Sequence, residues 1–463
     1  MRIIISNELT IENAPDTLYD WAAQNLTFPN PDYAKKIKMG LWTGNTPKEL
    51  RMYEINGDNL ILPFGVIRNV FPLIRGGEIV TDFAEPRTVN FNGHPVPLYD
   101  YQERAVAELF KSKYGILQAP AGSGKTQIGI ELMKRLSAKT LWLTHTADLL
   151  KQSRERAERY IEPYLIGTIT EGKVEIGAGV TFATVQTMAH LDLTKYKYEW
   201  RTIIVDEVHR VCTSANGLAM FEKILSHLSA PNKYGLTATV HRSDGMIKAT
   251  KALVGDVVSE IPAEAVADKI MPVTIFPYGT NCPLPDQALN PDGTLNFTRM
   301  ISALAEDETR NALIAECVTQ NWKHSCLILS DRLSQLDAIM GMLPSDLQAL
   351  AVKIDGSMTS KKAKREREEA IAQMRTGQKR FLFATYSLAK EGLDIPRLDR
   401  LFMATPVKDY AVVVQSIGRI ARVSPEKETP IAYDFVDNFH YAKIAYKQRL
   451  RHYRKANAII KED

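Results

Sequence analysis

The sequence has few cysteines and no long run of apolar residues. No two cysteines form the C-x-x-C pair that is typical of a zinc site, and their scatter does not suggest a disulfide framework. We therefore expect reduced, buried thiols at Cys212, Cys282, Cys317 and Cys326. No segment approaches the length of a membrane span, and the opening MRIIISNELTIENAPD turns acidic after a short apolar stretch, unlike a secretory signal. These absences predict an intracellular protein.

The chain also has little net charge, +4 over 463 residues, with 45% hydrophobic and 24% charged residues. These values are ordinary for a globular protein, and the length predicts two to four domains. The charge is unevenly placed, because the residues from Tyr441 onward include seven Lys or Arg and two acids. Such a segment suits the binding of a polyanion, and it equally suits a solvated helix.

Short apolar, β-rich runs alternate with longer polar stretches in two parts of the chain. The first part, residues 114–240, contains YGILQAP, TLWLTH, VTFATV, TIIVDE and YGLTAT, and the second contains VTIFPY, SCLILSD, RFLFATY, RLFMATP and IAYDFVD. This alternation is typical of βα units on a parallel sheet. We therefore predict an α/β fold with two similar domains in tandem. Residues 278–294, rich in Pro, Asn and Gly, are interpreted as a loop or linker, and the first 90 residues show no clear βα period.

A glycine-rich stretch, APAGSGKT at 119–126, follows the apolar run YGILQ and precedes QIGIELMKRL. Glycines let backbone amides face phosphate oxygens, Lys125 supplies positive charge to the β- and γ-phosphates, and the Thr126 hydroxyl is placed for Mg²⁺. The expected strand before the motif and helix after it favour a phosphate site over a chance glycine-rich turn. The candidate nucleotide-binding residues of this loop are Ala121, Gly122, Ser123, Gly124, Lys125 and Thr126.

Two acids end the apolar run in IIVDEVHR. Asp206 would hold Mg²⁺, directly or through water, and Glu207 would polarise a water for attack on the γ-phosphate. The alternative is an acidic turn at the end of a strand. A GTPase would carry an N-K-x-D signature, and the nearest string, NKYG at Asn232, lacks the aspartate.

Two arginines lie three residues apart in QSIGRIAR, residues 415–422. In a helix, positions i and i+3 share a face, so Arg419 and Arg422 would point the same way from one turn. Such a pair suits an anion, and the alternative is pairing with surface acids.

Taken in order along the chain, these motifs resemble those of superfamily 2 helicases and translocases of the DExH kind, here with the variant DEVH, over residues 95–440. The further matching strings are LYDYQERAV, LTHTADLLKQ, FATVQTM, GLTATVHR, LILSDR and TYSLAKEGLDIP. LTFPNPDYAKKIKMG and LILPFG also resemble the N-terminal module of XPB-type and UvsW-type branched-DNA helicases, although Phe64 stands where that branch has a basic residue.

The resemblance implies two tandem RecA-like domains with ATP and Mg²⁺ in the cleft between them. Gln102 is then expected to read the adenine, Gln415 to position the attacking water, and Arg419 with Arg422 to reach the γ-phosphate when the cleft closes. Arginines at that point would stabilise the charge that gathers on the phosphoryl oxygens in the transition state. The remaining implied nucleotide ligands are Gly392 and Asp394, and the implied coupling residues are His209, Thr237 and Thr239.

The family also implies a nucleic-acid strand that crosses both domains just past several strand ends. Hydroxyl and amide groups there would contact phosphates and read no base sequence. The candidate contacts are Thr144, His145, Thr184 and Gln186 in the first domain and Ser330, Arg332, Thr385 and Ser387 in the second. The expected domains are an accessory, DNA-recognition domain at 1–92, RecA-like domains at 93–270 and 271–440, and a basic C-terminal helix or tail at 441–463.

The leading functional prediction is an ATP-dependent DNA helicase or translocase that remodels branched or duplex DNA in recombination, repair or replication. Its expected partner is DNA, with no membrane, in the cytoplasm of a bacterial or phage-infected cell. A DExH-type RNA helicase and the motor subunit of a restriction-type system are the alternatives. A nucleic-acid clamp with a decayed motor is a further alternative, and it is opposed by the joint presence of Lys125, Asp206, Glu207, Arg419 and Arg422.

Overall fold

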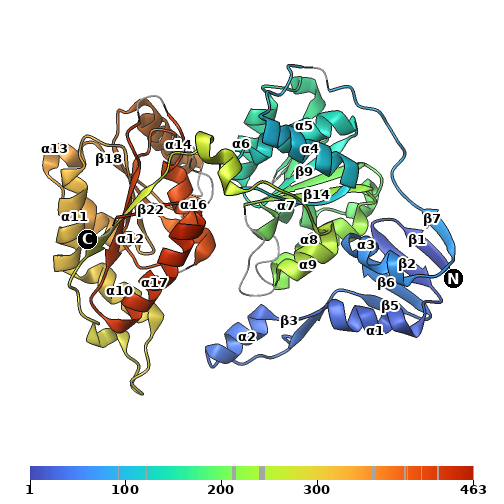
Figure 1. Ribbon diagram of the computed structural model, residues 1–463, viewed down its shortest axis with the longest axis horizontal. Coiled ribbons are helices and arrows are strands. Elements are labelled where there is room, and N and C mark those ends of the chain that lie inside the picture. The colour runs from blue at the N-terminus through green and yellow to red at the C-terminus, as the bar shows by residue number, and fades with distance from the viewer. Residues whose placement is uncertain are drawn as a thin grey trace. The chain divides into compact units, whose positions relative to one another are not determined.

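The structure, a computed structural model, describes residues 1–91, 93–120, 122–170, 172–210, 215–238, 246–356, 361–390, 393, 395–407, 409–424 and 427–461. The chain divides into two compact units, Met1–Pro262 and Ala263–Asp463. Each unit contains its own large sheet with helices against it (Figure 1).

The first unit is centred on an eight-stranded sheet that is parallel apart from the antiparallel pairing of its edge strand. In spatial order the strands are β11 (Lys173–Glu175), β10 (Ile166–Thr170), β12 (Val180–Thr184), β9 (Thr140–Thr144), β13 (Thr202–Asp206), β14 (Asn232–Thr237), β8 (Tyr114–Gln118) and β15 (Val257–Glu260). Strands β9, β12 and β13 are buried along their whole length. Burial on both faces explains why each is apolar without alternation.

Between residues 100 and 254 of this unit, helices alternate with the strands of the sheet, as in βα units. They are α4 (Asp100–Ser112), α5 (Lys125–Leu136), α6 (Ala147–Ala157), α7 (Val185–His190), α8 (Ala215–His227) and α9 (Ile247–Val254). Several begin with a side-chain cap, such as Thr146 on α6 and Thr184 on α7, whose hydroxyls accept a backbone N–H of the first turn.

The second unit has a seven-stranded sheet in which all pairings are parallel. In spatial order the strands are β18 (Ala351–Ile354), β19 (Phe381–Thr385), β17 (Cys326–Ser330), β20 (Arg400–Met403), β21 (Ile431–Val436), β16 (Thr274–Gly279) and β22 (Ile459–Ile460). Its helices are α10 (Phe297–Glu306), α11 (Glu308–Gln320), α12 (Leu333–Gly341), α13 (Ser345–Gln348), α14 (Lys361–Thr376), α15 (Tyr386–Lys390), α16 (Tyr410–Ile420) and α17 (His440–Lys455).

Both faces of this second sheet are covered. Side chains alternate between the faces of a strand, and along β17 Leu327 and Leu329 join one hydrophobic cluster while Cys326 and Ile328 join another. Helices therefore pack on the two sides of one parallel sheet, which confirms the predicted α/β class with two RecA-like sheets. All ten apolar runs singled out in the sequence contain strands of these sheets. Within the described residues, no helix combines the length and apolar composition needed to cross a membrane.

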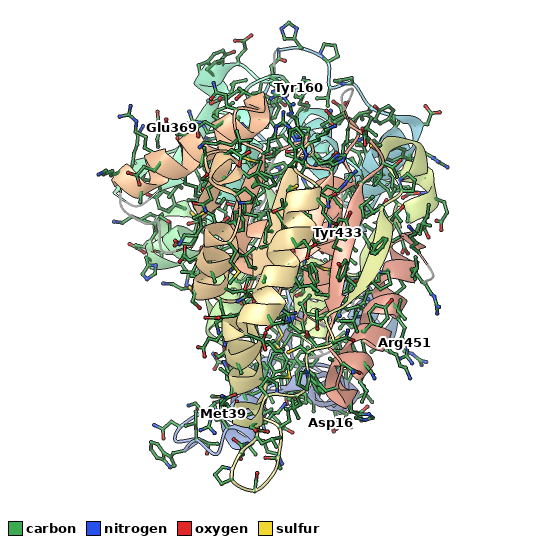
Figure 2. The ribbon with its side chains drawn as sticks, turned by 90° about the vertical axis from the view of Figure 1, so that its left-hand side faces the viewer. Asp16, Met39, Tyr160, Glu369, Tyr433 and Arg451 are labelled. Carbon is green, nitrogen blue, oxygen red and sulfur yellow. The ribbon has the colours of Figure 1, made fainter. Side chains whose placement is uncertain are left out.

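Two segments of the second unit differ from their interpretation in the sequence. Residues 278–294 are largely loop, as expected, but they do not link the units, because they lie inside the second one, where Cys282 and Ala288 are buried. The C-terminal segment is not wholly a solvated helix, because Arg449 and Tyr453 of α17 are buried and β22 extends the sheet. Arg451 does face outward from α17 (Figure 2). The three described cysteines are free and buried.

Residues 1–81, here called the N-terminal module, form a five-stranded sheet with the order β5-β6-β2-β1-β7. The strands are β1 (Arg2–Ile5), β2 (Glu8–Glu12), β5 (Glu54–Asn56), β6 (Asn59–Pro63) and β7 (Glu78–Thr81), and α1 (Asp16–Asn25) follows β2. A small pair, β3 (Thr27–Pro29) with β4 (Glu49–Arg51), encloses α2 (Pro31–Lys38) and the loop after it. Figure 1 shows α2 projecting away from the five-stranded sheet.

The N-terminal module shares a hydrophobic core with the eight-stranded sheet. One cluster joins Leu9 and Leu60 of the module to Leu225 of α8 and Leu253 of α9. The backbones approach closely at Gly65, where an added Cβ would lie 2.4 Å from the carbonyl oxygen of Lys251. Any side chain at that position would have to displace backbone, so the glycine permits the module to dock.

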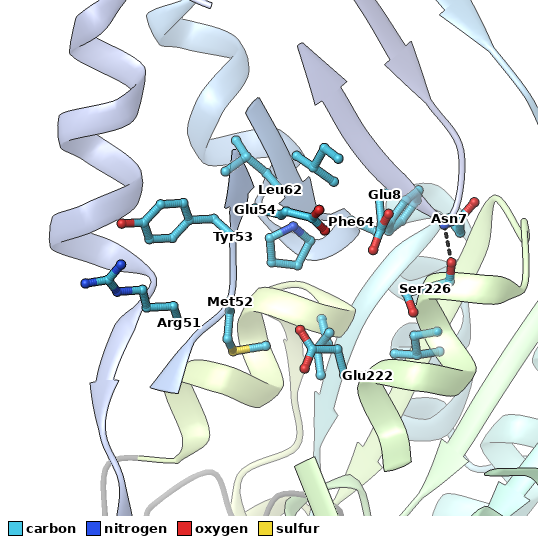
Figure 3. Close-up of a pocket in the computed structure, with 14 residues that line it drawn as sticks. Asn7, Glu8, Arg51, Met52, Tyr53, Glu54, Leu62, Phe64, Glu222 and Ser226 are labelled. Carbon is cyan, nitrogen blue, oxygen red and sulfur yellow. Dashed lines mark hydrogen bonds between the residues drawn. The ribbon is translucent and has the colours of Figure 1, made fainter. Parts of the chain in front are cut away.

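Ionisable groups are also partly buried at this junction. A cavity of about 290 Å³ lies between the module and α8, lined by Asn7, Glu8 and Phe64 on one side and Glu222 on the other (Figure 3). Asn7 donates from its side chain to the carbonyl of Ser226. Burial raises the pKa of Glu8 to about 7, against the attraction of Lys233, and raises the pKa of Glu222.

Candidate functional site

The glycine-rich loop lies between β8 and α5, as the motif requires. Gly122 and Gly124 have φ values of 85° and 80°, in the left-handed region that favours glycine. A Cβ on Gly124 would also lie 2.3 Å from Nε2 of Gln102. The loop delivers the chain into α5 at Lys125, and the first backbone N–H groups of a helix have no partner within it. The loop therefore presents donors where a phosphate would bind.

Side chains from α4 hold the loop from beneath. Gln102 donates from Nε2 to the carbonyl of Ser123 at 2.8 Å and accepts the N–H of Tyr99 at 2.9 Å, and the Tyr101 hydroxyl donates to the same Ser123 carbonyl at 3.3 Å. The Ser123 hydroxyl is buried and has no hydrogen-bond partner among the described residues. Gln102 thus contacts the loop itself, and its predicted contact with adenine stays a prediction.

Lys125 reaches across the mouth of the loop. Its Nζ donates to the carbonyl of Ala119 at 3.3 Å and lies 3.8 Å from a carboxylate oxygen of Glu207. Thr126 follows in the first turn of α5, half-buried. The sheet therefore brings the two sequence motifs together, because β8 and β13 end at the same edge.

The paired acids end β13. Asp206 is buried, accepts the Ser153 hydroxyl at 3.3 Å and accepts the N–H of Glu207 at 3.0 Å. Burial and the neighbouring Glu207 carboxylate raise the pKa of Asp206 to about 6, against the attraction of Lys125. Glu207 has φ +50°, a left-handed conformation that is uncommon for residues other than glycine. Strained backbone of this kind concentrates at functional sites.

His209 connects the acids to the next strand. Its Nδ1 lies 2.8 Å from the Thr237 hydroxyl at the end of β14 and 3.3 Å from a Glu207 carboxylate oxygen. Both His209 and Thr237 are buried. This chain of contacts links the end of β14 to Glu207, the carboxylate predicted to polarise the attacking water.

In the second unit, α16 carries Gln415, which is buried, and Arg419, whose Nη1 donates to the carbonyl of Leu393 at 3.4 Å. The helix that was expected to carry both Arg419 and Arg422 does not extend to Arg422. The helix ends at Ile420, and Arg422 forms an isolated antiparallel bridge with Ile270. The N–H of Met271 donates to the carbonyl of Ala421 at 2.7 Å, so pairing with a neighbouring segment replaces the next helical turn.

The predicted nucleic-acid contacts of the first unit follow strand ends as expected. Thr144 ends β9 and its hydroxyl donates to the carbonyl of Thr146, while Thr184 ends β12 and caps α7. His145 comes directly after β9, and Gln186 lies in the first turn of α7. Both threonine hydroxyls thus make local bonds that organise the loops.

The predicted contacts of the second unit show the same pattern. Ser330 is buried and its hydroxyl donates to Gln335, and Arg332 reaches the Ser302 hydroxyl and the carbonyl of Thr298. The hydroxyls of Thr385 and Ser387 lie 2.9 Å apart after β19, with Ser387 exposed. The remaining predicted site residues, Ala121, Thr239, Gly392 and Asp394, lie outside the described residues.

The sequence motifs did not identify two side chains that make buried polar contacts, Ser153 and Arg449. Ser153 of α6 binds Asp206, and no local pattern marks it. Arg449 of α17 is buried, although it lies in a basic run. Its helical phase was a usable signal, because Ala442, Ala445, Arg449 and Tyr453 share one face and are all buried.

Comparisons with known proteins match the two units separately. Residues 95–242 match the family described as type III restriction enzyme, res subunit, and residues 308–424 match the helicase conserved C-terminal domain. The DNA 3'-5' translocase XPB2 of Sulfurisphaera tokodaii is 26% identical over 370 residues, which cover 72% of this chain and 80% of that protein. The probable helicase D10 of Escherichia phage T5 is 24% identical over 445 residues, which cover 94% of this chain and 90% of that protein.

Among solved structures, S. cerevisiae Dbp5 bound to RNA and ADP BeF3 aligns with a TM-score of 0.57 and 17% identity, over 78% of this chain and 89% of that one. At this identity the likeness concerns the fold. It agrees with the two parallel sheets described above.

Proposed function

We propose that this chain, whose fold, motifs and relatives are those of superfamily 2 helicases, is an ATP-dependent DNA helicase or translocase. The observation that carries the proposal is the meeting of Lys125, Asp206 and Glu207 at one edge of the first sheet. This set suits phosphoryl transfer, in which catalysis consists largely of positioning and charge stabilisation. Arg419 and Arg422 of the second unit are proposed to stabilise the charge of the transition state.

The residues of the first unit fit a nucleotide with Mg²⁺. Ser123 keeps a buried hydroxyl that is unpartnered among the described residues, and the N-terminus of α5 presents backbone donors. Thr126 and Asp206 would hold the Mg²⁺, and a cation there would favour the ionised form of the Asp206 carboxyl, whose pKa burial has raised. When bound, Mg²⁺ would offset negative charge on the phosphate oxygens. Glu207 would orient and polarise the attacking water.

For the remaining predicted residues we propose roles as a set. Gln102 would fix the loop and contact the base, Gln415 would position the water, and His209 with Thr237 would couple hydrolysis to movement. The hydroxyl and amide groups at the strand ends would contact the phosphates of a bound strand, which requires no base reading. The hydroxyls of three of these residues also make local hydrogen bonds that hold their loops, namely Thr144, Thr184 and Ser330. The backbone N–H groups of those loops are therefore as suited to phosphate contact as the hydroxyls themselves.

Two alternatives have specific support. The RNA alternative is supported by the solved structure of Dbp5, which has a similar fold and is bound to RNA. The restriction alternative is supported by the family that matches the first unit, which is described as the res subunit of a type III restriction enzyme. The relative named as a DNA 3'-5' translocase favours DNA. We further propose a role in repair, recombination or branch migration, in the cytoplasm of a bacterial or phage-infected cell.

Branched or distorted DNA is proposed as the preferred substrate because of the N-terminal module. The first 92 residues carry nine Lys or Arg and eleven Asp or Glu, but residues 31–48 hold four of the cations and one of the acids. Positive charge is thus gathered on α2 and its loop, where Lys35 and Lys38 are exposed and Trp42 is 88% exposed. Cations suit DNA phosphates, and an exposed indole can stack on an unpaired base.

The deciding experiment compares ATP hydrolysis with single-stranded, duplex, forked and four-way junction DNA, and with RNA. We expect stimulation by DNA, strongest with forks and junctions. Stronger stimulation by RNA than by DNA would replace the DNA proposal with the RNA alternative, and equal stimulation by linear single strands and junctions would remove the branched-DNA role alone.

Point variants test the module better than its deletion, because deletion would expose the shared hydrophobic core. In the double variant Lys35→Ala, Lys38→Ala, the slope of log K for DNA binding against log salt concentration should become shallower by about two. Trp42→Ala should weaken binding to forks by about 1–3 kcal/mol and leave duplex binding nearly unchanged. Arg75→Ala is the matched control, since Arg75 is an exposed cation of the same module outside residues 31–48.

A further inference from the structure

Helix α16, which carries Gln415 and Arg419, is preceded by a short segment that leaves β20. This segment, residues 404–407, is held by side chains from outside it. Arg310 of α11 donates to the carbonyl of Ala404 at 2.6 Å, and Arg449 of α17 donates to the carbonyl of Val407 at 3.0 Å. Two guanidinium groups therefore fix the two ends of the segment.

The middle of the segment is fixed as well. The Thr405 hydroxyl accepts the N–H of Asp331 at 2.9 Å, and its carbonyl accepts the Tyr386 hydroxyl at 3.0 Å. Thr405 is fully buried. The contacts come from three helices, α11, α15 and α17, and from Asp331 directly after β17, so separate parts of the unit fix the segment that leads to α16.

Each arginine is itself held by an aspartate, Asp434 within β21 for Arg449 and Asp437 directly after β21 for Arg310. Arg449 donates from Nε and Nη2 to the two oxygens of Asp434, both at 2.8 Å, and Arg310 donates from Nε to Asp437 at 2.7 Å. The Tyr453 hydroxyl adds a bond to Asp434 at 2.7 Å. A guanidinium bound at two points has a fixed plane, so the direction of its remaining N–H is fixed too.

Both ion pairs are almost completely buried, with Arg310 and Arg449 each 1% exposed. Buried ion pairs are poor devices for stability, because desolvation offsets most of the attraction. Their geometry instead suits the orientation of neighbouring groups. The remaining donor of each fork points at the one segment that leads to α16.

We propose that Arg310 and Arg449 are positioning residues for hydrolysis, and that they act by fixing residues 404–407 and hence the placement of Gln415 and Arg419. The inference rests on the proposed function of α16. Neither arginine lies in a motif of the nucleotide site, and neither touches substrate in this role.

The first test is Arg449→Lys. Lysine keeps the charge opposite Asp434 but is a point donor without a planar fork, so it cannot reproduce the bonds to both carboxylate oxygens and to Val407. We expect kcat of DNA-stimulated ATP hydrolysis to fall by about tenfold or more, with KM for ATP changed by less than about threefold. The melting temperature is measured in parallel.

A second variant covers the case in which the lysine variant fails to fold. Arg449→Met combined with Asp434→Leu removes both charges of the pair, a change that buried pairs often tolerate. It also removes the donor to Val407, so the same fall in kcat is expected. Tyr386→Phe removes the hydrogen bond from the Tyr386 hydroxyl to the Thr405 carbonyl, and it should lower kcat by a smaller factor.

Arg400→Lys is the matched control. Arg400 is also buried and also donates to a backbone carbonyl, that of Thr429, but it lies at the opposite end of β20 from the segment. We expect a similar loss of melting temperature with kcat within about twofold of wild type.

The outcomes separate the two claims. If the Arg449 variants lose stability as the control does and keep wild-type kcat, the arginines are merely structural and the inference is overturned. A wild-type protein without nucleic-acid-stimulated ATP hydrolysis overturns the proposed function, and with it the inference. A fall in kcat in the Arg449 variants, absent in Arg400→Lys, supports both.

Discussion

The two units treat buried positive charge in different ways. In the first unit, Lys233 of β14 is 1% exposed, donates to the carbonyl of Asn7 at 3.0 Å and lies 4.1 Å from the centre of the Phe64 ring. Burial lowers its pKa to about 7. In the second unit, Arg310 and Arg449 face aspartates at hydrogen-bond distance. A guanidinium group, unlike an ammonium group, is always charged in proteins. A buried lysine can lose its charge, and a paired arginine cannot.

The same division applies to the candidate catalytic groups. Lys125 serves the first unit, as a point charge on a flexible stem, and Arg419 and Arg422 serve the second. A lysine ammonium in a phosphate loop acts as a point charge, so its orientation matters little. A guanidinium is planar, and its N–H groups must be oriented toward the oxygens that they bind. Three predictions, in order of falling size, test how far this contrast holds.

Lys125→Ala should lower ATP hydrolysis by about 10² or more, because it removes the charge beside the predicted phosphate site. Affinity for DNA should stay nearly unchanged, since the proposed backbone contacts lie elsewhere. Steady-state hydrolysis and fluorescence anisotropy with labelled DNA measure the two effects.

Lys125→Arg sharpens this test. A guanidinium keeps the charge but is larger and planar, and we expect it to restore little of the activity. Near wild-type hydrolysis by Lys125→Ala would show that the glycine-rich loop does not hold the reacting phosphates.

Arg419→Ala should lower kcat by about 10², with a smaller effect on nucleotide affinity, because the arginine is proposed to act mainly on the transition state. Arg422→Ala should behave alike, although this residue lies outside the helix. Single-turnover hydrolysis and binding of a fluorescent ATP analogue measure these effects.

Arg419→Lys provides the comparison with the first unit, and we expect it to stay impaired. Equal losses of binding and of kcat in the alanine variants would instead indicate that the arginines bind ATP before the reaction.

The smallest effect concerns pH and the junction of the N-terminal module. Between pH 4.5 and about 7, folded Glu8 keeps a proton that the unfolded chain releases, so stability falls as pH rises. Between about 7 and 10.5, folded Lys233 lacks a proton that the unfolded chain holds, so stability rises. The first unit should therefore have a shallow stability minimum near neutral pH.

Calorimetry from pH 5 to 9 measures this minimum. In Glu8→Gln, the fall in the free energy of unfolding between pH 5 and about 7 should be smaller by about 1 kcal/mol, which corresponds to a few degrees in melting temperature. Glu78→Gln is the control, because Glu78 is an exposed glutamate of the same small sheet. An unchanged profile in Glu8→Gln would mean that Glu8 titrates normally in the folded protein.

The sequence was sufficient to predict the two parallel sheets. Strands buried on both faces must be apolar throughout, and short runs such as TIIVDE and CLILS stand out from the polar helices between them. It also assigned Lys125 and Glu207 to the same phosphate, and the structure places them 3.8 Å apart because β8 and β13 end at one edge of the sheet.

Other features depend on tertiary contacts that local sequence does not encode. The helix that contains QSIGRI ends before Arg422, where the chain pairs with Ile270, which is far away in sequence. The N-terminal module has short strands with mixed pairing, and so lacks a strong period. Arg449 looks like a surface cation until its aspartate partner on β21 is known.

The shared core of the N-terminal module has a consequence for folding. Because Leu9 and Leu60 belong to the same cluster as Leu225 and Leu253, neither part can unfold without exposing apolar surface of the other. Residues 1–262 should therefore melt in one cooperative transition. If this module were exchanged between related motors, the residues of α8 and α9 that pack against it would have to change with it. We therefore expect module and motor to be inherited together.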